Sequence, residues 1–175
     1  YFDKNELLSE IKSKPDNFFL IFRNANFKKY QIKNDVNRLS NLYKDNGFRN
    51  IKVTYKTEYI SSKNTFNVYF YVNEGLLYNF SQFHTDTQIT NINLDQIDHI
   101  NNIVNDYYSK KISKKNFYNE SKINKLTEII SDYLYDIGLI FFEIQVLENV
   151  EDTNVDILYK IIDAPEKYVD QINIF

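Results

Sequence analysis

The strongest constraint on the fold is an imperfect internal repeat with a period near 90 residues. A stretch with helical apolar spacing, a turn that contains glycine and two alternating stretches occur in this order at 27–75 and again at 118–164. Both copies keep the helical period and the strand period in register, which isolated chance matches would not do. The chain is therefore expected to be an array of small modules.

The two copies differ in length at one place only. Through the helix, the turn and the first strand, equivalent residues are 91 positions apart, and in the second strand they are 89 apart. We interpret the change as a two-residue difference between the hairpin loops, where length changes cost least. The matched residues of the first copy are Phe27, Ile32, Leu39, Leu42, Tyr43, Asp45, Gly47, Ile51, Val53, Tyr55, Phe66, Val68, Phe70 and Val72, and those of the second are Tyr118, Ile123, Ile130, Tyr133, Leu134, Asp136, Gly138, Phe142, Ile144, Val146, Val155, Ile157, Tyr159 and Ile161.

Length and composition limit the number of domains and several classes of function. A chain of 175 residues allows one or two domains, and the repeat favours two of roughly 75–90 residues each. The net charge of −3 argues against nucleic acid as the main partner. The absence of cysteine excludes disulfides, a thiol nucleophile and cysteine-ligated zinc. No apolar run approaches the ~20 residues that a membrane-spanning helix needs.

The first module is predicted to contain two helices and a β-hairpin. Asp3 and Glu6 have the spacing of a capping box at the start of the first helix. Gly47 stands where a left-handed residue is expected after the second helix. The predicted segments are a short helix that ends by Pro15, an aromatic-rich connection over 17–27 with Phe18, Phe19 and Phe22, a helix over 29–45, and strands over 51–57 and 66–72.

The second module is predicted to add a leading strand to the same order of elements. Asn93 and Gln96 form a second capping pattern, and Gly138 ends the last helix as Gly47 does in the first module. The predicted segments are a strand over 77–84, a helix from Asn93 to about Tyr107, a basic loop over 110–115, a helix capped by Asn119, strands over 140–147 and 154–162, and a further strand over 168–175.

These segments divide the chain into three parts. Residues 1–75 form a module that lacks its first strand, and residues 76–164 form a complete module. Residues 165–175 are expected to provide the first strand of a module that follows. The predicted fold class is α+β.

The order of elements and three short motifs resemble the POTRA domain (polypeptide-transport-associated). Residues 42–48 (LYKDNGF) and 73–75 (NEG) are similar to the turn after its second helix and to its Glu-Gly ending. Residues 117–123 (FYNESKI) are similar to the entry into that helix. The resemblance covers the whole chain. More specifically, the two modules resemble the third and fourth POTRA domains of an Omp85-family outer-membrane assembly factor.

This resemblance implies tandem modules of β-α-α-β-β order, each with a three-stranded mixed sheet covered by two helices. It implies a non-enzymatic scaffold at the periplasmic face of the outer membrane of a Gram-negative cell, as part of a larger protein with adjacent POTRA domains and a C-terminal barrel. The implied partners are unfolded outer-membrane protein clients and accessory assembly lipoproteins, bound by pairing at strand edges. No cofactor and no nucleic acid are implied.

The candidate site is the first strand of the first hairpin, which the resemblance places at the edge of the sheet. Lysines along such an edge protect it against aggregation, which is one interpretation. The other is an edge that accepts partner strands. The residues of this candidate partner-binding strand edge are Ile51, Lys52, Val53, Thr54, Tyr55, Lys56 and Thr57.

No pattern in the sequence indicates catalysis or a metal site. His84 and His99 lie in different predicted elements, with no paired acidic motif near either. Asp35, Asp45 and Asp136 fit ordinary helix and turn positions. The lysines of 110–115 are interpreted as a solvated loop, although they would also suit an anionic lipid or nucleic acid.

Two alternative functions stay open at this point. One is the POTRA region of a two-partner-secretion transporter. The other is a module that binds single-stranded nucleic acid by stacking bases on Tyr and Phe of a small sheet. The acidic balance of the chain counts against the second alternative.

Overall fold

The structure is a computed structural model that describes residues 1–13 and 28–165, which fall into two compact units. Unit 1 contains Tyr1–Leu77 and Tyr118–Glu120, and unit 2 contains Tyr78–Phe117 and the chain from Ser121 onward. The predicted aromatic connection with Phe18, Phe19 and Phe22 and the predicted strand over 168–175 lie outside the described residues.

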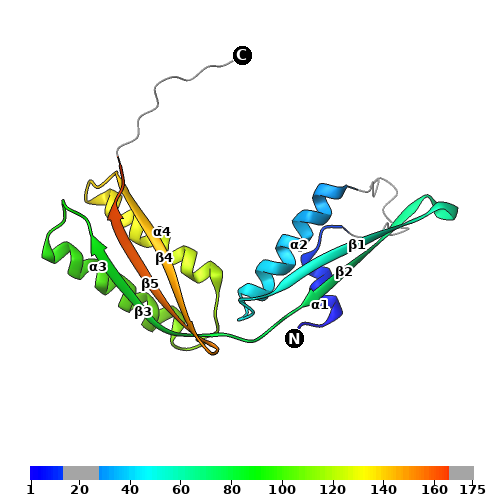
Figure 1. Cartoon of the computed structure of the whole chain (residues 1–175), viewed down its shortest axis with the longest axis horizontal. Coiled ribbons are helices and arrows are strands. Elements are labelled where there is room, and N and C mark those ends of the chain that lie inside the picture. Colours follow the sequence, from blue (N-terminus) through cyan, green and yellow to red (C-terminus); the bar gives the residue numbers. More distant parts are fainter. Residues whose placement is uncertain (14–27, 166–175) are drawn as a thin grey trace, which may run out of the picture. The chain divides into compact units, whose positions relative to one another are not determined.

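Unit 1 consists of two helices on one face of a β-hairpin (Figure 1). The predicted capping box is present at the start of the first helix. The Asp3 side chain accepts from the Glu6 amide, and the Glu6 side chain accepts from the Asp3 amide. β1 and β2 pair antiparallel from Lys52↔Asn73 to Ile60↔Thr65. The elements are α1 (Lys4–Glu10), α2 (Lys29–Lys44), β1 (Lys52–Ile60), the 3₁₀ turn η1 (Ser61–Lys63) and β2 (Thr65–Asn73).

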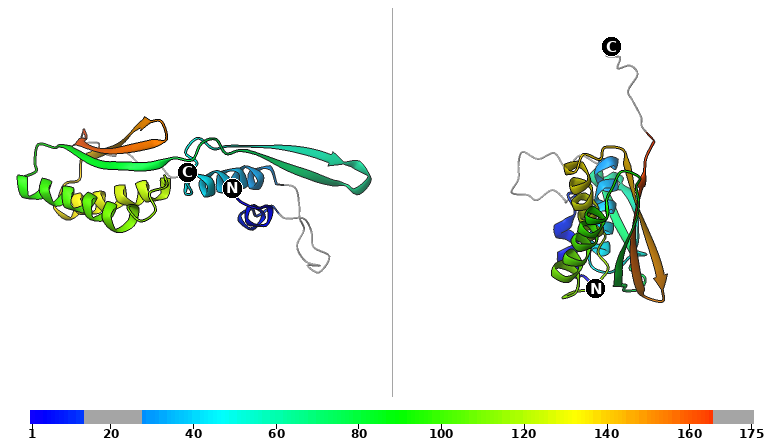
Figure 2. Two further views of the ribbon diagram at one scale, coloured as in Figure 1. Left: turned by 90° about the horizontal axis from the view of Figure 1, so that it is seen from below. Right: turned by 90° about the vertical axis from the view of Figure 1, so that its left-hand side faces the viewer.

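Unit 2 is a three-stranded sheet in the order β3-β5-β4, with both long helices on one face (Figure 2). β3 runs parallel to the central strand β5, and β4 runs antiparallel to it. Asn93 and Gln96 form the predicted capping box of α3. The elements are β3 (Asn79–Gln88), α3 (Leu94–Tyr107), the π-helix η2 (Tyr108–Ile112), α4 (Glu120–Asp136), β4 (Phe142–Glu151) and β5 (Asn154–Asp163).

The repeat predicted from the sequence is present in the structure. Buried, half-buried and exposed positions of 31–43 coincide one for one with those of 122–134. The hairpin loop is 61–64 in unit 1 and 152–153 in unit 2, so the predicted two-residue difference is confirmed. Gly47 and Gly138 both have positive φ, 99° and 88°, as the predicted helix ends require.

The core of unit 2 lies between β5 and α4. Alternate residues of β5 are fully buried against the helices, and the side chains of α4 that face them are buried as well. The Tyr159 hydroxyl donates to the Ile123 carbonyl oxygen at 3.2 Å, and burial raises the pKa of this phenol. The fully buried residues of the two elements are Val155, Ile157, Tyr159, Ile161, Leu126, Ile130 and Leu134.

The leading strand of unit 2 ends later than predicted, at Gln88 instead of His84. A β-bulge between Phe80 and Phe83 shifts the register against β5, so that both rings are buried and lie 5.0 Å apart. The bulge interrupts the alternation by which strands are recognised in sequence. The polar residues beyond it were therefore not assigned to the strand.

The predicted basic loop over 110–115 begins instead within a π-helix, η2. Ile112 is fully buried, and the Ser113 amide donates to the Tyr108 carbonyl oxygen at 3.0 Å, five residues back. The apolar anchor at Ile112 keeps the chain helical where the surrounding lysines suggested a loop.

Candidate strand-pairing site

The candidate edge coincides with β1, which pairs with β2 alone among the strands that the structure describes. Ile51 precedes β1 and donates its amide to the Phe48 carbonyl oxygen at 3.1 Å, so its N–H belongs to the turn. Lys52 to Thr57 form the first two-thirds of the strand. One row of backbone N–H and C=O groups on β1 therefore faces away from β2.

Side chains on β1 alternate between the helices and the solvent. Val53, Tyr55 and Thr57 are half-buried toward α2, and Lys52, Thr54 and Lys56 are exposed. The exposed face also carries Tyr69 and Tyr71 of β2, which pair with Lys56 and Thr54 in the antiparallel register. The predicted alternation within the candidate edge is confirmed.

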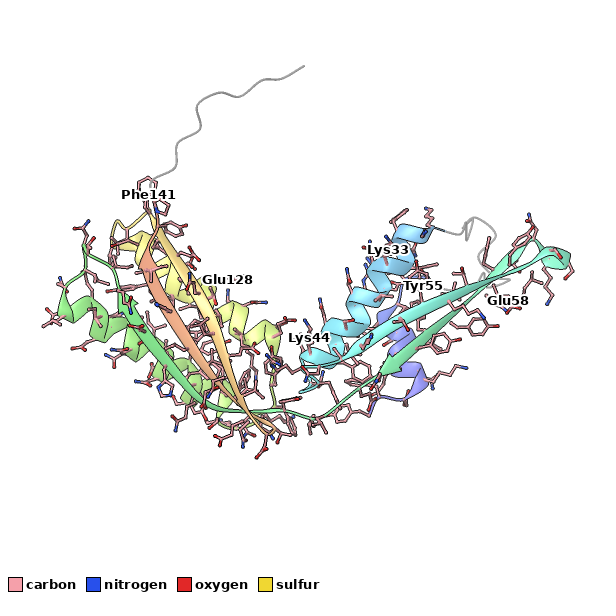
Figure 3. The ribbon with its side chains drawn as sticks, viewed as in Figure 1. Lys33, Lys44, Tyr55, Glu58, Glu128 and Phe141 are labelled. Carbon is pink, nitrogen blue, oxygen red and sulfur yellow. The ribbon has the colours of Figure 1, made fainter. Side chains whose placement is uncertain are left out.

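A groove with a volume of about 460 Å³ runs between β1 and α2. Figure 3 shows Lys33 on α2 and Tyr55 on β1 beside each other at this groove. Its apolar lining comes from both elements, next to the unpaired row of backbone groups. The lining residues are Lys33, Val36 and Asn37 of α2 and Val53, Thr54 and Tyr55 of β1.

A free strand edge beside an apolar groove suits the binding of an extended segment. Backbone groups of such an edge can pair with those of an added segment, and every second side chain of the segment would then face the groove. Lys33, Lys52 and Lys56 form no ion pair with any residue that the structure describes. These lysines keep the edge soluble and give it a positive charge.

The position of α2 in this site depends on a buried carboxylate. Asp35 has no exposed surface and accepts from the Lys12 and Ser13 amides at 2.8 Å each and from Arg38 at 2.6 Å. Burial opposes its ionisation, but these donors outweigh burial and hold the Asp35 pKa below its usual value. Asp35 thereby ties the chain after α1 to α2.

The prediction of an ordinary helix position for Asp35 does not include this role. A signal was available, because Asp35 lies on the apolar stripe between Ile32 and Leu39. Its equivalent in the second copy, 91 residues on, is the fully buried Leu126. An acidic residue at a position that the other copy fills with leucine indicates a buried polar contact.

The Glu-Gly ending of the first module has a structural role as well. The Tyr43 hydroxyl at the end of α2 donates to Glu74 Oε1 at 2.9 Å, just after β2. Burial and the Glu74 carboxylate raise the pKa of Tyr43 to about 12. This bond holds the end of α2 against the end of the hairpin.

The described residues contain no group of three or more His, Cys, Asp or Glu side chains placed to hold a metal ion. His84 on β3 lies 3.0 Å from Gln82 Oε1, and the His99 ring on α3 lies 4.5 Å from the Tyr133 ring. Within the same residues, no helix combines the length and apolarity needed to cross a bilayer.

Known proteins with similar sequences or folds support the predicted POTRA resemblance. Residues 1–75 match the POTRA family, described as "Surface antigen variable number repeat". This match covers the first of the two predicted modules. A curated relative is the outer membrane protein assembly factor BamA of Buchnera aphidicola, 28% identical over 141 residues. That match covers 77% of this chain, and the chain spans about a fifth (21%) of the relative's length.

Solved POTRA structures share the fold. POTRA3-5 of Haemophilus influenzae BamA matches with a TM-score of 0.65 and 15% identity, over 91% of this chain and 60% of that one. BamA of Haemophilus ducreyi lacking POTRA domains 1–3 matches with a TM-score of 0.56 and 14% identity, over 88% and 29%. POTRA1-2 of Omp85 from Anabaena matches with a TM-score of 0.50 and 11% identity, over 93% and 86%.

These matches confirm the predicted fold class, tandem POTRA modules of α+β type. The predicted resemblance to an outer-membrane assembly factor is confirmed as well, since the relative and two of the structures are BamA. The assignment to the third and fourth POTRA domains and the domain boundaries at 75 and 164 stay predictions.

Proposed function

We propose that this POTRA segment is a periplasmic scaffold of an outer-membrane β-barrel assembly factor and that the β1 edge of unit 1 binds strands of unfolded clients. The observation that carries the proposal is the combination of an unpaired strand edge and an adjoining groove. Accessory assembly lipoproteins, adjacent POTRA domains and a C-terminal barrel are the further partners that the relationship to BamA suggests.

Client strands of a β-barrel suit this site for a physical reason. They alternate apolar and polar residues and differ widely in sequence. Hydrogen bonds from a strand edge ask only for an extended backbone, so they serve many sequences. Val36, Val53 and Tyr55 offer apolar contacts to the inward side chains of such a strand.

Site-directed crosslinking tests the proposal, because the chain has no cysteine of its own. We expect a photoreactive maleimide on Thr54→Cys to form adducts with an unfolded β-barrel peptide. The control is Asp98→Cys, an exposed position on α3 of unit 2. Adducts of equal yield at both positions would contradict specific binding at the edge.

Proline substitution at the same position tests the backbone contribution. Thr54→Pro removes one N–H, which leaves the hairpin intact provided that this N–H faces away from β2. For this test the photoreactive label is placed on Lys33→Cys, across the groove from β1. We expect the labelled protein that also carries Thr54→Pro to crosslink less than the one without it, with circular dichroism unchanged. A variant that keeps both its fold and its full crosslinking yield would exclude this edge as the client site.

A further inference from the structure

Given the proposed strand-binding function, we propose that the edges of the two modules sort clients by charge. The β1 edge of unit 1 selects strands with acidic side chains, and the β4 edge of unit 2 selects strands with basic side chains. Like β1, β4 is an outer strand, and among the described strands it pairs with β5 alone. The proposal thus concerns two outer strands that occupy the same place in their modules.

The repeat makes the two edges comparable residue by residue. Lys52 pairs with Asn73 in unit 1, and its equivalent Glu143 pairs with Ile162, the equivalent of Asn73. Thr54 corresponds in the same way to Gln145. Positions with the same place in the register therefore carry different charges.

A strand bound at the unit 1 edge would have lysines beside both of its faces, the solvent face and the groove face. Lys52 and Lys56 lie on the exposed face of β1, and Lys33 lies at the groove. The opposite charge on β1 is Glu58, nearer the hairpin tip, which accepts from the Tyr69 hydroxyl at 3.1 Å (Figure 3). Three lysines against one glutamate leave a net positive charge beside the edge.

The outer strand of unit 2 carries only acidic charges, with one basic side chain, Lys160 of the neighbouring β5, opposite Gln145. β4 (FEIQVLENVE) has no basic residue, and Glu143 and Glu151 are exposed on it. On α4 the equivalents of Lys33 and Asn37 are Asn124 and Glu128, and Glu128 forms an exposed ion pair with Lys125 at 2.8 Å. The sign of the charge beside the edge is thus inverted between the modules.

Charges in these places act on the side chains of an added strand. Directly opposed residues of paired strands lie about 4.5–5.5 Å apart, and opposite charges there stabilise while like charges destabilise. Each exposed pair changes the binding constant by only about 1.4- to 5-fold, so one lysine discriminates weakly. Two or three charges of one sign acting together amount to a preference of about fivefold at low salt.

Matched crosslinking at both edges tests the inference. The probes are Thr54→Cys and Gln145→Cys, equivalent positions of β1 and β4. Each labelled protein is mixed with two peptides that share one alternating apolar pattern and carry either Glu or Lys at the polar positions. We expect about fivefold more adduct with the Glu peptide at Thr54→Cys and with the Lys peptide at Gln145→Cys.

A charge exchange and a salt series complete the test. Lys52→Glu introduces the residue that the second copy has at this position and is expected to abolish the preference of the unit 1 edge, with circular dichroism as the fold check. Raising the ionic strength to about 1 M, where the Debye length is ~3 Å, is expected to remove both preferences.

The outcomes separate the sorting from the function on which it rests. Equal yields of both peptides at both edges, or the same peptide preferred at both, would overturn charge sorting and leave strand binding intact. Yields no higher than at Asp98→Cys with either peptide would overturn both proposals. Opposite preferences that disappear with Lys52→Glu at the unit 1 edge and with salt at both edges would support the sorting.

Discussion

Ile130→Ala is expected to destabilise unit 2 by about 2–5 kcal/mol, the cost of a large-to-small change in a packed core. Ile130 on α4 has no exposed surface and lies on the helix face that packs against β5. Its equivalent in unit 1, Leu39, is 2% exposed, and Leu39→Ala is expected to cost a similar amount. Denaturant unfolding of each variant measures the loss.

Two units of similar size can unfold separately, so the loss must be assigned to one of them. Peptide-resolved hydrogen exchange makes this assignment: Ile130→Ala should raise exchange in β5 and α4, and Leu39→Ala should raise it in α2. Asn124→Ala, an exposed position on α4, is the control and should change stability by less than about 0.5 kcal/mol. Losses this small at Ile130 and Leu39 would show that other helix faces are buried.

Asp35→Ala is expected to destabilise unit 1 by about 3 kcal/mol, because two backbone amides and Arg38 lose their buried acceptor. The amides of Lys12 and Ser13 should lose their protection from hydrogen exchange. Asn34→Ala, the exposed neighbour on α2, is the control. Protection of both amides in a folded Asp35→Ala protein would contradict the anchoring role.

The effect of Asp35 should depend on pH with a definite sign. Because the folded-state pKa of Asp35 is lowered, its carboxylate stabilises unit 1 fully above the unfolded pKa of ~3.9. This contribution is lost as the pH falls through the lowered folded-state pKa. The stability difference between wild type and Asp35→Ala is therefore expected to be constant near neutral pH and to shrink below about pH 4.

Features that local chemistry determines could be predicted from the sequence. The capping boxes at Asp3 and Asn93 and the helix ends at Gly47 and Gly138 all follow from a few neighbouring residues. The repeat strengthened these assignments, since each element was seen twice. The alternation within the candidate edge was predicted for the same reason.

Features that depend on tertiary contacts could not be predicted. The bulge at Phe80 and Phe83 exists because both rings reach the core of unit 2, and the π-helix exists because Ile112 is anchored. The groove beside β1 arises from the spacing between α2 and β1, which no local pattern encodes. The buried contact of Asp35 lies between these two cases. The helix pattern around Asp35 does not indicate it, but the leucine at the equivalent position of the second copy does.

If both outer strands bind client segments as proposed, their presence in two modules has a kinetic consequence for a long client. A single edge holds a strand weakly and releases it quickly, because a few backbone hydrogen bonds in water contribute little net free energy. A client held at one edge keeps its other segments at a high effective concentration near the second, so release of one segment does not free the chain. Such a scaffold retains an unfolded polypeptide while every individual segment stays free to leave and fold.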